Sequence, residues 1–373
     1  MKRRLSALIL LLLALLPGCE FAAPPDQTAH TPAAGTLEVH FIDVGQADSA
    51  LILCGGESIL IDGGNVDDAS LVVSYLDEQG VETLDYVVCT HAHEDHVGGL
   101  SGVLAVYEAG TVFSPVTEYD SAAFQNFVSY TQAQGLALTV PQAGDSFSLG
   151  EAQVTILGPL AEYEETNNTS LVLRVDFDET AFLFTGDMER IAEADLLEYS
   201  AGELWATVLK VGHHGSSTSS SYPFLREVLP TYAVISCGTG NSYGHPHKET
   251  MEKLKKAGCQ VLRTDEEGTI TAFSDGKTIT WSTGTAAVPG TSAGSGGNQT
   301  AAIPDTDNGA AAENEAGNPS TRSSYVINTN TGKFHRPDCA SATQMKPENR
   351  KDVTASRDEL VQEGYEPCKQ CRP

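Results

Sequence analysis

Basic side chains are scarce in this sequence. Its 373 residues contain 22 Lys and Arg against 50 Asp and Glu, which gives a formal net charge of −28 at pH 7. The imbalance counts against tight non-specific binding of nucleic acid by the acidic part of the chain, because contacts with phosphate depend on Lys and Arg. It does not exclude catalysis on phosphates, since bound metal ions reverse the local electric field.

Long apolar runs are also absent once the N-terminus is passed, so no second segment is predicted to cross a membrane. At the N-terminus, three basic residues precede an apolar run from Leu8 to Leu16 and then Pro17-Gly18-Cys19. This pattern predicts a secretory signal peptide over residues 1–19, and the small residue before Cys19 resembles the lipobox of bacterial lipoproteins. We therefore expect an extracytoplasmic bacterial protein that is anchored to the membrane through lipidated Cys19. A plain signal peptide, cleaved a few residues later to give a secreted protein, is the alternative.

The eight cysteines do not form the dense disulfide framework of a small exported protein. Four of them lie in or beside apolar, strand-like runs, and we interpret them as core thiols: Cys54, Cys89, Cys237 and Cys259. The last three lie close to the C-terminus and belong to a different feature.

Two segments lack the large apolar side chains that a folded core needs. Residues 20–36, in which Ala, Pro, Thr and Gly are prominent, are typical of a tether, and residues 285–322 are typical of a disordered linker. They leave two predicted folded units, residues 37–284 and residues 323–373. The second holds eight Lys and Arg against seven Asp and Glu, so the acidity belongs to the rest of the chain.

Short β-prone segments alternate with helical patterns in the larger unit. Apolar residues recur at three-to-four spacing in four segments, which predicts helices over 68–79, 121–134, 190–199 and 248–256. Apolar β-prone runs predict strands near 37–42, 50–53, 58–61, 86–89, 112–113, 153–157, 170–175, 181–184, 206–211, 232–236, 260–264, 269–273 and 278–281. Together they indicate an α+β fold of the αββα sandwich type, in which helices cover two facing sheets.

The strongest motif follows the apolar run Tyr86–Cys89. It reads His91-Ala-His93-Glu-Asp95-His96-Val-Gly98-Gly99. Three imidazoles and a carboxylate within six residues suit zinc or a similar divalent ion, and the two glycines let the backbone turn into the next helix. The spacing predicts a metal site rather than a surface cluster of histidines.

Three later stretches place further chemical groups after β-prone runs. Asp187 follows the first of them and could bridge two cations, whereas His213 and His214 follow the second and are candidates to complete a site. The third is the glycine-rich loop that contains His245 and His247. It could supply an acid or an oxyanion contact, and a purely structural role is equally expected for His247.

Taken in order, these motifs resemble the metallo-β-lactamase superfamily, and within it the hydrolase domain of the competence protein ComEC. The resemblance rests on Phe41-Ile-Asp43-Val-Gly45-Gln46-Ala-Asp48-Ser49, Leu60-Ile-Asp62-Gly63-Gly64, the His91 motif, Thr185-Gly186-Asp187, Lys210-Val-Gly-His-His-Gly-Ser216 and Asn241-Ser-Tyr-Gly-His245-Pro246. It covers nearly the whole of residues 37–284 and implies the αββα fold of that superfamily.

The resemblance implies a role for each ligand. His91 and His93 would bind one metal ion, Asp95 and His96 the other, and Asp187 would bridge them. His213 or His214 would then serve the second ion. One departure is that no histidine occurs between His96 and His213, where the superfamily usually has another ligand. Either Asn168 takes its place or the first ion is weakly held.

The mechanism that follows from the resemblance is hydrolysis by a hydroxide that two zinc or manganese ions activate. Asp95 is then a metal-ligating catalytic residue, and His245 is a candidate acid for the leaving oxygen. Asp43 and Asp62 are candidates to orient the ligands, although a role at a turn or strand end is equally expected for both.

The last fifty residues carry a second metal-binding pattern. His335-x3-Cys339 is followed by Cys368-x2-Cys371, which is the spacing of a structural zinc site. A unit of this size has little core, so a zinc ion would supply much of its stability. The alternative is a Cys368–Cys371 or Cys339–Cys368 disulfide with one free thiol. The segment resembles the small zinc domain related to the N-terminal part of the Ada DNA-repair protein, but His335 stands where that family has its methyl-accepting cysteine. Alkyl transfer is therefore not expected.

Our leading hypothesis is an exported, metal-dependent phosphodiesterase or nuclease with a nucleic-acid or other phosphodiester substrate, similar to the DNA-uptake relatives. Hydrolysis of a small ester, thioester or β-lactam would use the same metal ligands. A surface-tethered binding protein with an incomplete metal site is the non-enzymatic alternative. No protein partner is identifiable from the sequence.

Overall fold

The computed structural model describes residues 35–284 and 323–371, the latter without residues 330, 338, 344, 356–359, 361–364 and 369–370. The predicted signal peptide, the lipidated Cys19, the tether before residue 35 and the linker 285–322 lie outside the described residues. Among the helices of the described ranges, none has the length and apolarity needed to cross a membrane.

The larger unit contains two mixed β-sheets. The first has eight strands in the order β15-β14-β1-β2-β3-β4-β5-β6. Its strands are β1 Leu37–Phe41, β2 Ala50–Cys54, β3 Glu57–Ile61, β4 Leu84–Val88, β5 Ala109–Phe113, β6 Leu138–Thr139, β14 Thr269–Ser274 and β15 Ile279–Gly284. Pairing is antiparallel from β15 to β3 and parallel from β3 to β6.

The second sheet repeats this division into an antiparallel and a parallel half. Its seven strands lie in the order β13-β12-β11-β10-β9-β8-β7. They are β7 Ser146–Leu149, β8 Ala152–Gly158, β9 Val172–Phe177, β10 Thr180–Phe184, β11 Val208–Lys210, β12 Tyr232–Ile235 and β13 Gln260–Arg263. The pairs from β10 to β13 are parallel and those from β7 to β10 are antiparallel.

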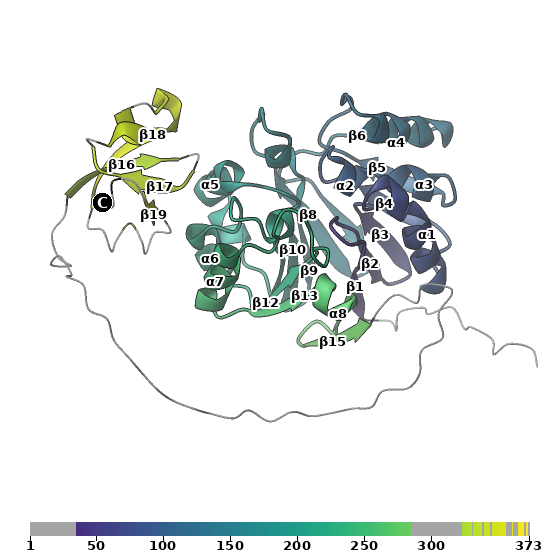
Figure 1. The fold of residues 1–373 in the computed structure, drawn as a ribbon. Coiled ribbons are helices and arrows are strands. Elements are labelled where there is room, and N and C mark those ends of the chain that lie inside the picture. Colours follow the sequence, from purple (N-terminus) through teal and green to yellow (C-terminus); the bar gives the residue numbers. More distant parts are fainter. Residues whose placement is uncertain are drawn as a thin grey trace, which may run out of the picture.

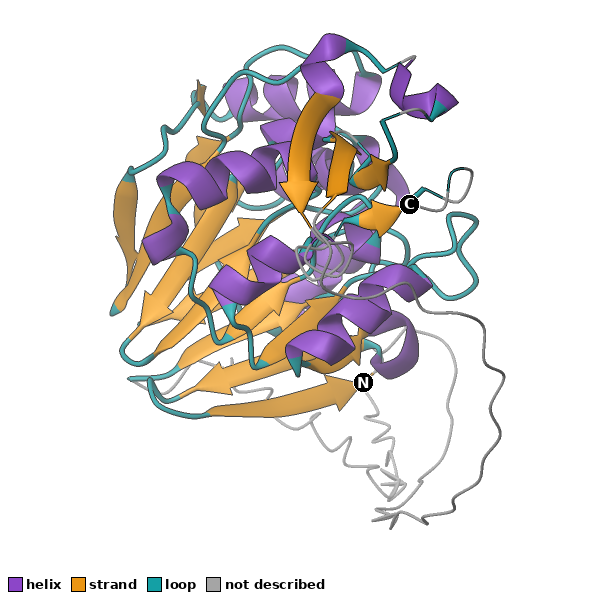
Figure 2. Ribbon diagram, turned by 90° about the vertical axis from the view of Figure 1, so that its left-hand side faces the viewer, coloured by secondary structure: helices purple, strands orange, loops and turns teal. Residues whose placement is uncertain are grey.

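Helices cover the outer face of each sheet, as Figures 1 and 2 show. Against the first sheet lie α1 Ala69–Glu78, α3 Leu100–Leu104 and α4 Ala122–Ala133, and against the second lie α5 Arg190–Tyr199, α6 Tyr222–Val228 and α7 Lys248–Ala257. The shorter helices are η1 Val66–Asp68, α2 Glu94–Val97, η2 Thr166–Thr169, η3 Ala201–Glu203, η4 Gly212–Gly215 and α8 Thr264–Glu267. The expected αββα sandwich is therefore confirmed.

The layers are held together by three apolar clusters. One lies between the sheets and includes Phe41 and Phe184, whose rings stack with centroids 5.9 Å apart. The other two lie between each sheet and its own helices, around residues such as Phe124 and Phe224. Because both faces of the inner strands are buried, β1, β2 and β10 are buried at every position. Strands β2 and β10 accordingly show no alternation of polar and apolar residues, whereas β1 alternates and buries Glu38 and His40.

The sequence predicts four helices that the structure contains with bounds within one residue: α1, α4, α5 and α7. It does not predict β6, β7 or α6. The first two strands are only two and four residues long, and β7 contains two serines. Helix α6 begins at Ser221, whose hydroxyl accepts a hydrogen bond from Phe224 N–H, inside a run of serines that hides the start of the helix.

The C-terminal unit is a four-stranded sheet in the order β18-β16-β17-β19. Its elements are β16 Ser323–Asn328, β17 Lys333–His335, α9 Ala340–Thr343, η5 Pro347–Asn349, β18 Arg350–Ala355 and β19 Glu366–Pro367. Its core is small and includes Tyr325, Ile327 and Phe334. It touches the larger unit at α5, where Arg190 Nη1 donates a hydrogen bond to the Thr331 carbonyl over 2.8 Å.

Candidate metal centre

The chemical groups predicted from the sequence converge at one edge of the sandwich. The loops that carry them follow β4 of the first sheet and β10, β11 and β12 of the second. In each sheet these strands are in the parallel half, so their carboxyl ends point to the same edge. This is where open parallel sheets place their functional loops.

Asp62, at the end of β3, fixes the start of the His91 motif. Its two carboxylate oxygens accept from the backbone N–H and the hydroxyl of Thr90, both over 2.7 Å. The Asp62 Oδ2 atom also lies 2.8 Å from Nδ1 of His96. Since a carboxylate accepts, Nδ1 of His96 carries a proton, and Nε2 is the nitrogen left for a metal ion. Asp62 therefore orients a metal-ligand candidate, which is one of the two roles that the sequence leaves open for it.

Close approach of the backbone explains the glycines of this motif. A Cβ atom on Gly99 would collide with the carbonyl oxygen of Gly63, and one on Gly98 would collide with the backbone nitrogen of Val66. Glycine at these positions lets the loop after β3 cross the turn after α2. Where the two segments cross, His96 and Asp62 are in contact.

Asp43, the second candidate for orienting a ligand, does not contact the ligand candidates as Asp62 does. Its Oδ1 accepts from Gly45 N–H over 3.2 Å, and its own N–H donates to Thr269 Oγ1. The side chain thus shapes the turn after β1, and it contacts none of the predicted ligands in the hydrogen bonds of the described residues.

A second carboxylate, Asp48, lies behind His214 in the way that Asp62 lies behind His96. The Nδ1 atom of His214 is 3.1 Å from the Ser236 carbonyl oxygen and 3.1 Å from Asp48 Oδ1. Both neighbours are acceptors, so Nδ1 carries a proton and Nε2 is the nitrogen left for a metal ion. The other oxygen of Asp48 accepts from Lys210 Nζ over 2.7 Å, in an ion pair that is almost completely buried.

Four side chains bring their ligand atoms together: Asp95, His96, Asp187 and His214. These atoms all lie within 4.8 Å of one another. His96 Nε2, His214 Nε2 and Asp187 Oδ1 are buried and make no hydrogen bond, although His96 Nε2 lies 3.2 Å from Asp187 Oδ1 and His214 Nε2 lies 3.3 Å from Asp95 Oδ2. Buried polar atoms without a partner are costly, and here they point at each other, which is the arrangement that a bound cation relieves. Two imidazoles with two carboxylates fit zinc or manganese.

The electrostatics of this cluster fit a cation as well. Although burial raises the pKa of Asp187, His96 and His214 lower it well below its ordinary value. Burial lowers the pKa of His214, but Asp187 and Asp48 raise it to about 10. The carboxylates therefore stay charged, and protons on the imidazoles balance them when no metal is bound. A divalent ion competes with those protons for the same lone pairs.

His91 and His93 form a separate pair beside this cluster. Their rings are edge to face, and His91 Nε2 lies 3.1 Å from His93 Nδ1. His91 is buried, and burial together with the charge of His96 lowers its pKa well below the ordinary value. It is therefore a neutral imidazole, as metal binding requires. These two nitrogens are the candidate ligands of the first ion, and they lie outside the four-residue cluster that contains Asp187.

Asn168 is buried and supports the loop after Asp187. Its side-chain oxygen accepts from Glu189 N–H over 3.0 Å, and the neighbouring Ser170 hydroxyl accepts from Asp187 N–H over 3.1 Å. The segment around Asn168 thus positions the backbone of Asp187.

His213 and His214 differ in position although they are adjacent. Both have left-handed backbone conformations, with φ of 51°. His214 is buried in the four-residue cluster, whereas His213 is at the rim, where its Nδ1 lies 3.4 Å from Glu189 Oε1 and its Nε2 lies 3.7 Å from Asp187 Oδ2. Left-handed geometry in non-glycine residues is uncommon and often occurs at functional sites.

His245 lies at the same rim. Its ring centroid is 5.6 Å from that of His213 and 6.3 Å from that of His214. Gln46 Oε1 accepts from Gly238 N–H, so the Gln46 amide N–H faces His245 Nδ1 over 3.3 Å. His245 is therefore protonated on Nε2. Burial and the neighbouring histidines lower its pKa to about 4, which makes it a neutral donor at neutral pH.

The sequence motifs include Asp48 and Lys210, but sequence reasoning assigns neither of them a role. The available signal was Lys210 itself, a cation inside the apolar run Val208–Val211, since a buried ammonium group needs a charged partner. The position of that partner, 162 residues earlier in the chain, is a property of the fold alone.

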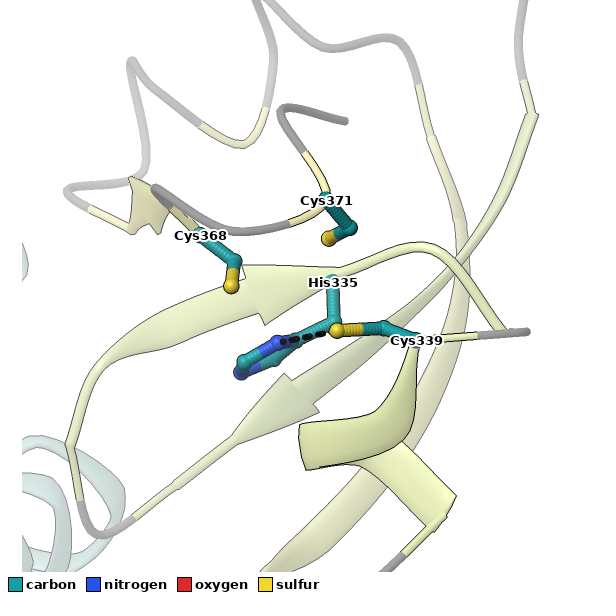
Figure 3. Close-up of side chains that lie close together, drawn as sticks. All are labelled: His335, Cys339, Cys368 and Cys371. Atoms are coloured by element: carbon teal, nitrogen blue, oxygen red, sulfur yellow. Dashed lines mark hydrogen bonds between the residues drawn. The ribbon is translucent and has the colours of Figure 1, made fainter.

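In the C-terminal unit the structure brings the four predicted ligands together, as Figure 3 shows. The ligand atoms of His335, Cys339, Cys368 and Cys371 lie within 4.8 Å of one another, with His335 Nδ1 3.5 Å from Cys339 Sγ. Burial raises the pKa of Cys339, but hydrogen bonds, above all from His335, bring it down to about 6. The seven cysteines of the described residues are all free thiols. The cluster is compatible with a small zinc domain.

Comparison with curated proteins finds relatives associated with competence. The chain is 30% identical over 252 residues to the ComE operon protein 3 of Bacillus subtilis (strain 168), which covers 62% of this chain and 32% of that protein. It is 32% identical over 229 residues to the competence protein ComA of Neisseria gonorrhoeae, over 61% of this chain and 31% of the relative. The chain thus spans about a third of the length of these relatives.

Among solved structures, the metallo-beta-lactamase fold protein YhfI of Bacillus subtilis is 14% identical, with a TM-score of 0.44, and the match covers 63% of this chain and 98% of that one. This similarity is too low to bear on activity. The family model described as the metallo-beta-lactamase superfamily matches residues 42–239, which contain the strands and loops that carry His91 to His214. The chain therefore belongs to the metallo-beta-lactamase superfamily.

Proposed function

We propose that the protein is a metal-dependent phosphodiesterase that acts on nucleic acid. The observation that carries the proposal is the set of buried, unpartnered ligand atoms on His96, His214 and Asp187. Asp95, His96, Asp187 and His214 would hold one divalent ion, zinc or manganese, and His91 and His93 with Asp187 would hold a second. When bound, such ions lower the pKa of water and offset negative charge on phosphoryl oxygens.

The protein's own residues have distinct parts in this hydrolysis. Asp62 and Asp48 fix the rings of His96 and His214 with Nε2 facing the centre. His245, neutral and protonated on Nε2, donates a hydrogen bond to a phosphoryl or leaving oxygen at the rim. It acts as a neutral donor, because a group with a pKa of about 4 is not an imidazolium at neutral pH.

The shape of the centre favours a large substrate. The side chains of Asp95 and His213 are 33% and 23% exposed, whereas His96 and His214 are buried, so one side of the ligand cluster faces solvent. A polymer can reach such an exposed site, because its chain does not have to fit inside a closed pocket. The relatives named for competence, and a recombination protein 2 of Haemophilus influenzae that is 30% identical, support nucleic acid as the polymer.

We also propose that the protein acts outside the cytoplasm. The support is the sequence of the N-terminus, with its basic start, its apolar run and the Pro17-Gly18-Cys19 end, which is typical of a lipid-anchored protein. Labelling cells with a radioactive or clickable fatty acid tests the anchor, because Cys19→Ser should remove the label and release the protein from the membrane fraction.

The hydrolase proposal is tested with the full chain purified in detergent. Zinc- or manganese-dependent hydrolysis of bis(p-nitrophenyl) phosphate and of a single-stranded oligonucleotide is measured for the wild type and for Asp95→Ala. The matched control is Glu94→Ala, which removes the exposed carboxylate next to it on α2.

We expect turnover that Asp95→Ala abolishes and Glu94→Ala preserves. Metal binding without turnover of either phosphodiester would refute the proposal. Turnover of nitrocefin or a thioester by the same preparation would then identify a small-molecule hydrolase. If none of these substrates is hydrolysed, the non-enzymatic hypothesis of a surface-tethered binding protein is the one that stands.

A further inference from the structure

Tyr243 is an exposed aromatic residue at the rim of the metal centre. Its side chain is 67% exposed, and its ring lies nearly parallel to that of His245, with centroids 5.6 Å apart and planes 23° apart. The His245 ring is in turn nearly parallel to the ring of the buried ligand candidate His214, at 22°. The three rings form a series from the ligand cluster to the surface, and Tyr243 is its outer end.

The loop that presents this ring is fixed by its own side chains. Asn241 Oδ1 accepts from His245 N–H over 3.0 Å, and the Asn241 amide donates to Gly238 O over 2.9 Å. His247 Nδ1 accepts from Ser217 N–H, so its Nε2 carries the proton and donates to the Tyr243 carbonyl over 3.2 Å. Single exposed aromatics are common on protein surfaces. Tyr243, in contrast, is held in a defined position beside the candidate metal centre.

Cations continue the surface beyond the loop. Helix α7 begins one residue after His247 and carries exposed lysines at Lys248, Lys255 and Lys256, together with exposed Glu249 and Glu252, the latter paired with Lys248. These lysines are three of only ten Lys and Arg between residues 35 and 284, in a unit that is otherwise strongly acidic. A strand whose base contacts Tyr243 could therefore place a phosphate near Lys248, the lysine that directly follows the loop.

We infer that Tyr243 is a stacking platform for a nucleobase next to the scissile phosphodiester, and hence that the substrate is single-stranded nucleic acid. This inference rests on the proposed phosphodiesterase function and specifies its substrate. Aromatic side chains bind single strands by stacking on bases of any sequence, whereas the bases of a duplex are stacked on one another and cannot reach a surface ring. Tyr243 contributes binding, and the metal ligands carry the chemistry.

The test separates the contribution of the bases to binding from that of the phosphates. Binding of a fluorescent oligothymidylate is measured by anisotropy with the full, zinc-loaded chain, and compared with an oligomer of equal length and charge in which every base is absent. We expect the wild type to bind the oligothymidylate about tenfold more tightly than the abasic oligomer, the effect of one stacked base. Tyr243→Ala should remove that ratio and Tyr243→Phe should keep it, because the phenyl ring still stacks.

Tyr199→Ala is the matched control, since Tyr199 is 71% exposed at the carboxyl end of α5. It should leave the ratio unchanged. The inference is overturned if the wild type shows no preference for bases, if Tyr243→Ala retains the preference, or if a duplex of the same sequence depends on Tyr243 equally. These readouts do not need turnover, so they remain decisive even if bis(p-nitrophenyl) phosphate is not hydrolysed.

Discussion

The carboxylate of Asp48 lies 3.1 Å from Nδ1 of His214 and, through its other oxygen, 2.7 Å from Lys210 Nζ. The backbone N–H of the same Asp48 donates to the Asp95 carbonyl over 3.0 Å. One residue thus links two of the four ligand candidates to a buried cation on β11. The pair is the counterpart of Asp62 and His96 on the other side of the cluster, and together they fix both imidazoles from behind.

Asp48→Asn is therefore expected to weaken metal binding about 10- to 100-fold, the usual effect of losing a group that orients a metal-ligating histidine. The affinity for zinc is measured by competition with a chromophoric chelator. Asp43→Asn is the matched control on the same loop, because Asp43 shapes a turn through Gly45. Equal zinc affinities for the two variants would contradict the orienting role of Asp48.

Lys210→Met is expected to destabilise the larger unit in a pH-dependent manner. Burial raises the pKa of Asp48, but Lys210 and His214 lower it far below the ordinary value. A carboxylate with a lowered pKa in the folded state stabilises the fold above its unfolded-state pKa of about 4, and loses that contribution as the pH falls further. The variant should lose about 3–5 kcal/mol at pH 7, since it leaves a buried charge without its partner. The loss should be smaller at pH 3.

This difference is measured by urea unfolding at both pH values, followed by the fluorescence of the two tryptophans, Trp205 and Trp281, which both report on the larger unit. Lys248→Met is the control, because Lys248 is 87% exposed in its pair with Glu252 and should cost much less. A loss of stability that is the same at pH 3 and pH 7 would show that Lys210 does not lower the pKa of Asp48.

The sequence predicts the metal ligands well because each follows an apolar strand, and strand ends are visible as a change from apolar to polar residues. His91, Asp187 and His214 all obey this rule, and parallel pairing brings their loops to one edge. Asp48, which orients a metal-ligand candidate, does not directly follow an apolar strand in this way. Asp48 is one of two aspartates in the loop between β1 and β2, and its contact with His214 depends on the packing of the first sheet against the second.

The sequence also cannot choose between His213 and His214. Adjacent residues in an extended strand point to opposite faces, but here both residues leave the strand with left-handed backbones. Their directions are set by the turn around Gly215, where a Cβ atom would approach Pro246 Cβ to 2.6 Å. That contact involves a loop thirty residues away in sequence, which no local pattern encodes.

His245 is expected to titrate with a pKa of about 4, because burial and the charges of His213 and His214 lower it. It should be neutral above pH 5, with its proton on Nε2, and become charged only as the pH falls through 4. Two-dimensional ¹H–¹⁵N spectra of the imidazoles measure both the pKa and the tautomer. Gln46→Glu should raise the pKa, since a carboxylate next to Nδ1 stabilises the charged ring. A pKa above 7 in the wild type would exclude the neutral-donor role at neutral pH.

Cys371→Ser is expected to remove one equivalent of metal from each chain and to expose the C-terminal unit to protease. The cluster of His335, Cys339, Cys368 and Cys371 lies beside a very small apolar core, so a bound ion would supply most of the stability of this unit. Metal content is measured by elemental analysis and cleavage by limited proteolysis. Cys259→Ser is the matched control, a half-buried thiol of the larger unit that should change neither.

The wild-type protein distinguishes metal from disulfide. Under denaturing conditions with a chelator, a metal site releases three reactive thiols from this cluster, whereas a disulfide leaves one. The tryptophan fluorescence of the larger unit should be unchanged by Cys371→Ser, because neither tryptophan lies in the C-terminal unit. Unchanged metal content together with one reactive thiol would establish the disulfide and remove zinc from the C-terminal unit, while leaving the centre at His96 and His214 untouched.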